Sequence, residues 1–143
     1  MKIAVKRVYE APSRRDGARV LVDRLWPRGV SKQSAALDKW LRDLAPSDEL
    51  RHWFHAYPSE WNKFRDRYLK ELAGEAAAND LAELYRLSNK SKVTLLFASR
   101  NEDHNNAIVL KELIEGARKP PTGTGPAAAR SARIRKAVRG PRK

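Results

Sequence analysis

The residues best suited to chemistry in this sequence follow two short apolar runs. The first run, at 20–22, leads into Asp23, Arg24, Trp26 and Arg28 within the stretch VLVDRLWPRG. Guanidinium groups bind phosphates and carboxylates through paired hydrogen bonds, and an indole offers a flat face to a base or sugar. These residue types predict a binding site for an anionic ligand, such as a phosphate, a nucleotide or another oxyanion.

The second run, VTLLFAS at 93–99, leads into the polar stretch RNEDHN. His104 is the one side chain of the two clusters that commonly transfers protons at neutral pH, so it is the candidate acid–base catalyst. Asp23 would orient His104 or act as a base itself. The remaining predicted site residues are ligand-binding: Arg7, Arg24, Trp26, Arg28, Lys32, Ser99, Arg100 and Asn105.

Each of these residues also has a purely structural alternative. Asp23 and Arg24 are neighbours on a strand and point to opposite faces, so Asp23 could simply pair with Arg7. Trp26 would then be a packing residue, and Asn105 the N-cap of the helix that follows it. The residue types alone leave both readings open.

Metal and cofactor motifs are weaker. His52 and His55 are three residues apart on a predicted helix, but we interpret the pair as the edge of a helix surface. Cysteine is absent, and no glycine-rich phosphate-binding motif follows a predicted strand. We therefore expect no metal and no cofactor.

The elements that must position these residues follow from hydrophobic periodicity. Alternating or continuous apolar runs predict strands, and apolar residues three and four apart predict helices. A continuous run such as VTLLFAS is typical of a central strand that is buried on both faces. The predicted strands lie at 2–10, 19–25 and 93–99, and the predicted helices at 34–45, 47–56, 59–74, 79–89 and 106–117.

This order predicts an α/β fold, a single domain with a small sheet of three or four strands and four to five helices. The link at 11–17 between the first two strands is too short for an ordinary parallel crossover, so we expect a mixed sheet. If the strands ending near residues 23 and 99 are parallel neighbours, their carboxyl ends meet and form one site.

Charge divides the chain into two parts. The net charge is +13, but residues 119–143 hold eight Lys and Arg and no acid, which leaves the first 118 residues at +5. We expect a folded domain at 1–118 and a disordered basic tail at 119–143. Non-specific binding of nucleic acid is predicted for the tail through Arg130, Arg133, Arg135, Lys136, Arg139, Arg142 and Lys143.

Composition also sets the expected compartment. The first residues, MKIAVKRVYE, contain too short an apolar run for a signal peptide. No apolar run approaches the roughly 20 residues needed to cross a bilayer. We therefore expect a cytoplasmic protein without membrane contact.

The stretches IAVKRVYE, DGARVLVDRLWPRGVSK and VTLLFASRNEDHNNAIVLKELI resemble the domain-of-unknown-function 488 family, in its YeaO-like branch. The resemblance runs from about residue 3 to residue 115 and implies a small, largely prokaryotic α/β protein without an established reaction. The family's signature stretches coincide with the two polar clusters. The matching positions are Arg7, Asp23, Arg24, Trp26, Pro27, Arg28, Gly29, Lys32, His104, Asn105 and Asn106.

Three functions remain open from the sequence. The first is a site for a small anionic ligand at the two strand ends, with acid–base chemistry by Asp23 and His104. The second is a protein that associates with nucleic acid through its tail. The third is an interaction module without catalysis.

Overall fold

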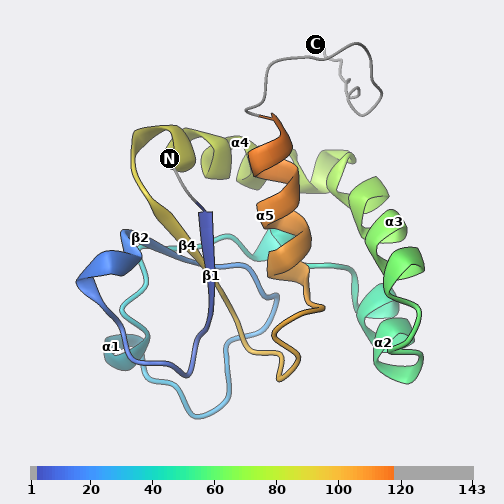
Figure 1. Cartoon of the computed structure of the whole chain (residues 1–143), viewed down its shortest axis with the longest axis horizontal. Helices are drawn as coiled ribbons and strands as arrows, with labels where there is room; N and C mark the ends of the chain where they lie inside the picture. Colours follow the sequence, from blue (N-terminus) through green and yellow to red (C-terminus); the bar gives the residue numbers. More distant parts are fainter. Residues whose placement is uncertain (1–2, 118–143) are drawn as a thin grey trace. The chain divides into compact units, whose positions relative to one another are not determined.

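The protein is described by a computed structural model that covers residues 3–117. Residues up to Glu112 form one compact unit, and Leu113 begins a second. The sheet and the helices confirm the small α/β fold (Figure 1). The elements are β1 (Ile3–Arg7), β2 (Ala18–Leu21), α1 (Lys32–Ala35), β3 (Lys39–Trp40), α2 (Asp48–Ala56), α3 (Trp61–Leu72), α4 (Glu75–Lys90), β4 (Val93–Phe97) and α5 (Asn106–Ala117).

The sheet has the strand order β1-β4-β2-β3, and all three strand pairings are parallel. The mixed sheet expected from the short link at 11–17 is therefore wrong. That expectation treats the first two strands as neighbours, whereas β4 lies between them and pairs with both. Every residue of β4 is buried, as a central strand requires.

The region predicted as one helix at 34–45 contains three different elements. The short α1 ends at Ala35, and its C-cap Ala36 has a φ of 49° in the left-handed region. β3 and a 3-10 turn (Arg42–Leu44) follow. Pairing of Lys39 with Val20 and of Trp40 with Leu21 extends the sheet. The helical spacing of apolar residues is thus overridden by tertiary strand pairing.

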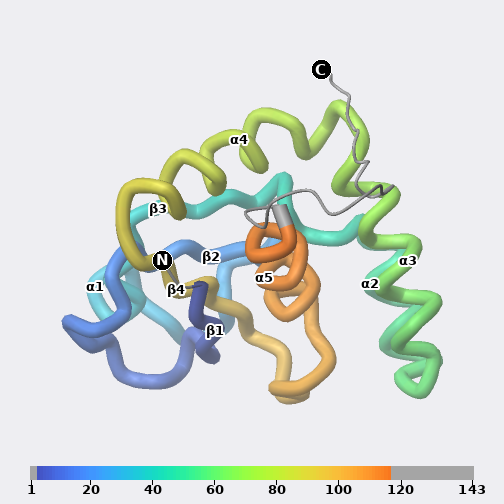
Figure 2. The backbone as a smooth tube through the Cα atoms, turned by 45° about the horizontal axis from the view of Figure 1, so that its top comes forward, coloured from blue at the N-terminus to red at the C-terminus, as the bar shows by residue number. Residues whose placement is uncertain are grey.

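The other predicted helices are present. Ser47 caps α2 by accepting a hydrogen bond from the backbone N–H of Leu50 at 3.1 Å. The C-cap of α3 is Ala73, so Gly74 follows the helix at the C′ position, where glycine is favoured, and is also the N-cap of α4. In both views α1 and the α2–α3 pair lie far apart (Figures 1 and 2).

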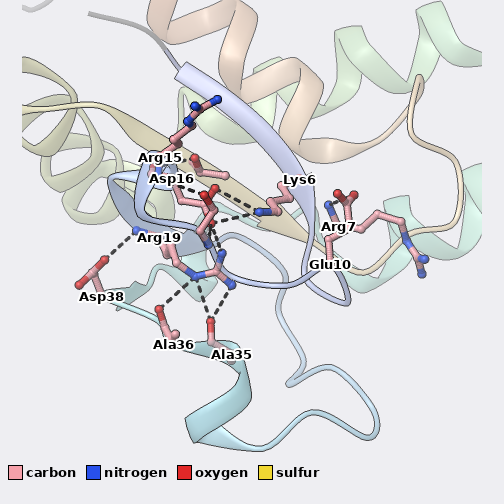
Figure 3. Close-up of polar contacts among 11 residues, drawn as sticks. Lys6, Arg7, Glu10, Arg15, Asp16, Arg19, Ala35, Ala36 and Asp38 are labelled. Carbon is pink, nitrogen blue, oxygen red and sulfur yellow. Dashed lines mark hydrogen bonds and ion pairs between the residues drawn. The ribbon is translucent and has the colours of Figure 1, made fainter.

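One face of the sheet carries a buried ion cluster (Figure 3). Asp16 accepts hydrogen bonds from Lys6 Nζ at 3.2 Å and from Arg19 Nη1 at 2.5 Å. Arg19 also donates to the carbonyls of Ala35 and Ala36, which fixes the end of α1 against β2. Further along the same face, Val8, Leu21 and Leu96 form a small apolar core. The partly buried residues that pack against this core are Trp26, Leu37, Trp40 and Ala98.

Within residues 3–117, no helix is long and apolar enough to cross a membrane. The basic stretch that starts at residue 119, with all its predicted nucleic-acid contacts, lies outside the described residues. The proposed boundary at 118 and the nucleic-acid contacts therefore stay predictions.

Candidate anion-binding site

Asp23 joins the two strand exits. One carboxylate oxygen accepts a hydrogen bond from the backbone N–H of Ala98 at 2.8 Å, and the other accepts one from Asn106 Nδ2 at 3.1 Å. Asn106 Nδ2 also donates to the carbonyl of Val22 at 2.9 Å. The loops after β2 and β4 and the start of α5 therefore meet at this carboxylate.

Burial raises the pKa of Asp23, and the hydrogen bonds from Ala98 and Asn106 and the charge of Arg51 offset only part of that increase. The net pKa lies above its ordinary value because desolvation disfavours the carboxylate. Both oxygens are already hydrogen-bonded to the protein. This geometry gives Asp23 a positioning role for the two loops.

We expect Asp23→Ala to lower the free energy of unfolding by about 2–3 kcal/mol, because it leaves the Ala98 N–H without its acceptor and the Asn106 amide with only the Val22 carbonyl. Urea unfolding of the variant measures the loss. The matched control is Asp66→Ala, at an exposed position of α3. Equal stability of the two variants would show that Asp23 does not hold the loops together.

Arg7 holds the same loop from β1. Its Nε donates to the carbonyl of Ser99 at 2.9 Å and its Nη2 to that of Ala98 at 3.1 Å. The hydroxyl of Ser99 accepts a hydrogen bond from the Asn101 N–H at 3.2 Å. Arg7 and Ser99, both predicted to bind ligand, thus also shape the turn after β4.

Arg24, in the loop after β2, is half-buried, and its side chain has fewer hydrogen-bond partners than those of Arg7 and Arg19. Its Nη2 donates to the Ala45 carbonyl over a long 3.4 Å. Arg24 also interacts electrostatically with the buried Tyr68. Burial and the charges of Asp23 and Glu71 raise the pKa of Tyr68 well above its ordinary value, and the charge of Arg24 offsets part of that increase. In the described part of the chain, this contact to Ala45 is the one hydrogen bond of the Arg24 side chain.

Trp26, Arg28 and Lys32 lie on the α1 side of the site. Trp26 is a packing residue, since its Nε1 donates to the Val30 carbonyl at 2.6 Å and its ring contacts Trp40 edge-on at 5.4 Å. Arg28 is exposed, and its carbonyl accepts a hydrogen bond from Tyr9 Oη at 3.0 Å. Lys32 is exposed at the first position of α1.

His104 lies on the other side, against α3. Its ring stacks on that of Trp61 with centroids 4.5 Å apart and an angle of 12° between the planes. Arg100 is exposed in the same loop. Asn105 caps α5, because its Oδ1 accepts a hydrogen bond from the Ile108 N–H at 3.1 Å.

The structure therefore brings the two strand exits together but separates their side chains. Arg7, Asp23 and Ser99 meet at the carboxyl edge of the sheet. Lys32 begins α1, whereas His104 stacks on Trp61 of α3, and α1 and α3 lie far apart in both views (Figures 1 and 2). No three His, Cys, Asp or Glu side chains among residues 3–117 gather as metal ligands.

Sequence reasoning missed Tyr9, which lies two residues after the end of β1 and contacts both Arg7 and Arg28. The rule that ligands collect at carboxyl ends of parallel strands applies to β1 as well. It would have found Tyr9 if the first strand had been predicted to end at Arg7 and not at residue 10.

Comparisons with known proteins agree with the resemblance. A family model described as the inactive DUF488-N3 subclade matches residues 2–132. An uncharacterized protein of Mycobacterium tuberculosis is 44% identical over 115 residues, which cover 80% of this chain and 95% of that protein. The uncharacterized protein YeaO of Escherichia coli is 43% identical over 113 residues, or 78% of this chain and 96% of YeaO. No solved structure matches.

Proposed function

The chain belongs to the inactive DUF488-N3 subclade of the domain-of-unknown-function 488 family, and from this premise we propose that it binds a small oxyanion without transforming it. The proposed contacts are Arg24 and Arg28, at the exit of β2. The ligand class is a phosphate or a phosphate-bearing molecule, which matches the fork of the guanidinium group. The description of the subclade as inactive favours a binding role over catalysis.

The incomplete pairing of Arg24 is the observation that carries this proposal. Lys6 and Arg19 each hold a carboxylate at 3.2 Å or less, and Arg7 holds two carbonyls at 2.9 and 3.1 Å. Arg24 is also half-buried, yet within residues 3–117 its five donors make one contact of 3.4 Å. A partly desolvated guanidinium with a single long hydrogen bond is costly, and a bound anion would remove that cost.

The placement of the two predicted catalytic residues supports binding as well. Asp23 uses both oxygens to hold the loops, and His104 stacks on Trp61 at the start of α3. A carboxylate that orients a catalytic histidine must lie within hydrogen-bond reach of the ring. Within residues 3–117, the carboxylate of Asp23 bonds Ala98 and Asn106 and makes no hydrogen bond to His104. Our proposal therefore assigns no proton transfer to either residue.

We expect inorganic phosphate to bind the full-length protein in isothermal titration calorimetry, and Arg24→Gln to weaken that binding about tenfold or more. A charge-assisted hydrogen bond contributes about 1.5–3 kcal/mol, and 1.4 kcal/mol corresponds to a factor of ten in affinity. Arg28→Gln is expected to act in the same direction with a smaller effect, since Arg28 is exposed.

The matched control is Arg14→Gln, which removes an exposed guanidinium from the 3-10 turn (Arg14–Asp16) between β1 and β2. It should leave phosphate affinity unchanged at physiological ionic strength. Equal losses of phosphate affinity in the Arg14 and Arg24 variants would mean that phosphate binding depends only on the overall charge of the protein. That outcome, or no binding by the unaltered protein, would refute the proposed function.

Association with nucleic acid stays an alternative prediction. It rests on the sequence of residues 119–143, where eight basic residues occur without an acid. Such binding would be tolerant of sequence and would weaken steeply with salt.

A further inference from the structure

Tyr9 is an exposed aromatic ring that is held in place at two points. Its side chain is 47% exposed, yet its Oη donates a hydrogen bond to the carbonyl of Arg28 at 3.0 Å. The guanidinium carbon of Arg7 lies 4.9 Å from the ring centroid. A ring fixed in this way has already lost rotamer freedom, so stacking a ligand on it costs less entropy than stacking on a free side chain.

Arg7, which contacts the Tyr9 ring, is itself held in place. Arg7 is anchored by its hydrogen bonds to the carbonyls of Ala98 and Ser99, directly after β4. The guanidinium group covers part of the ring and reinforces its position through a cation–π contact. The exposed part of Tyr9 is thus presented at the carboxyl edge of the parallel sheet, where ligands of such folds bind.

The second fixed point ties Tyr9 to the loop that carries the proposed anion contacts. Its hydrogen bond is to the backbone carbonyl of Arg28, so the ring lies against that part of the loop after β2. Leu25, in the same loop, is 65% exposed and adds apolar surface. An exposed aromatic ring that contacts the Arg7 guanidinium and is bonded to the backbone of Arg28 suits a ligand that combines a planar ring with a phosphate.

We infer that this ligand is a nucleotide, whose phosphates bind Arg24 and Arg28 and whose base stacks on Tyr9. This inference rests on the proposed function, because it specifies the molecule to which the bound anion belongs. Nucleobases of every kind have a π face, so stacking alone selects the class of ligand and not the base. The alternative is that Tyr9 only ties the β1 and β2 exits together.

Calorimetric titration of the full-length protein with ADP and with inorganic pyrophosphate tests the inference, because the two probes share a diphosphate and differ in the nucleoside. We expect ADP to bind about tenfold more tightly than pyrophosphate, since stacking of one base contributes about 1–3 kcal/mol. Tyr9→Leu should reduce this preference to about one. Tyr9→Phe, which keeps the ring but loses the hydrogen bond to Arg28, should retain most of it.

The control for ring loss in general is Tyr57→Leu, which removes another exposed tyrosine, after α2, and should keep the full preference for ADP. If Tyr9→Leu weakens both probes by the same factor, Tyr9 is a structural tie and the inference is overturned. Equal affinity of the unaltered protein for both probes also overturns it, while the anion site stands. Binding of neither probe would overturn the anion site and this inference together.

Discussion

Replacing Asp16 by asparagine is expected to lower the free energy of unfolding by about 3–5 kcal/mol, because it leaves a buried cation without its counter-charge. The side chains of Arg19 and Asp16 are only 5% and 9% exposed. Lys6 binds the same carboxylate, and the Ser13 N–H donates to it at 2.9 Å. An asparagine at this position would turn an N–H group toward donors that need an acceptor (Figure 3).

The pH dependence of this variant has a defined sign. Burial raises the pKa of Asp16, but the hydrogen bonds from Ser13, Lys6 and Arg19 lower it more, so the net pKa lies below its ordinary value of 3.8. Such a group contributes its full stabilisation above the unfolded pKa and loses it as the pH falls through the folded pKa. Urea unfolding should therefore show that the difference in free energy of unfolding between the unaltered protein and Asp16→Asn becomes smaller below pH 3.8.

Asp66→Asn, at an exposed position of α3, is the control for charge removal and should change stability by less than about 0.5 kcal/mol. If Asp16→Asn were as mild as this control, the ion cluster between β1 and β2 would contribute little to folding.

Replacing Gly17 by alanine is expected to cost about 3 kcal/mol or more, because this residue combines an unusual backbone conformation with a close approach. Its φ is 65° and its ψ is −137°, a region that only glycine adopts readily. An added Cβ would lie 2.3 Å from the carbonyl oxygen of Lys92, which accepts the N–H of Ala18 at 2.9 Å. Relief of the clash would therefore disturb the start of the β2–β4 pairing.

Gly29→Ala provides the matched control, because Gly29 also has a positive φ, of 78°, but an added Cβ there meets nothing within 4 Å. It should cost about 1 kcal/mol, which is the conformational strain alone. Thermal or urea unfolding of both variants measures the difference, which isolates the steric contact with Lys92. Equal losses at the two glycines would mean that the loop before β2 moves freely away from β4.

The two strand exits were predictable because their signals are local. A nearly continuous apolar run such as 93–97 is typical of a strand that is buried on both faces. The polar residues that follow it are then expected at the edge of the sheet. The meeting of Asp23 with the loop after β4 follows from the parallel pairing of β2 and β4. Sequence pattern therefore located the candidate site at the level of loops.

The orientation of the side chains within those loops was not predictable in the same way. The sequence is equally consistent with a Trp26 ring that faces a ligand and with one that packs in the core. The pairing of β3 with β2 brings Trp40 close to Trp26, and the two rings pack together. His104 is directed to Trp61 by the position of α3. Both contacts join residues that are distant in the chain.

The sequence by itself determined the α/β class, the central position of the strand at 93–97 and the polar strand ends, because burial and periodicity are properties of contiguous residues. Only the tertiary structure decided the strand order and the all-parallel sheet, since β4 enters between two strands that precede it by more than seventy residues. It also decided which cations are paired and that Arg24 lacks a close acceptor in the described chain, because pairing depends on which distant groups the fold brings into contact.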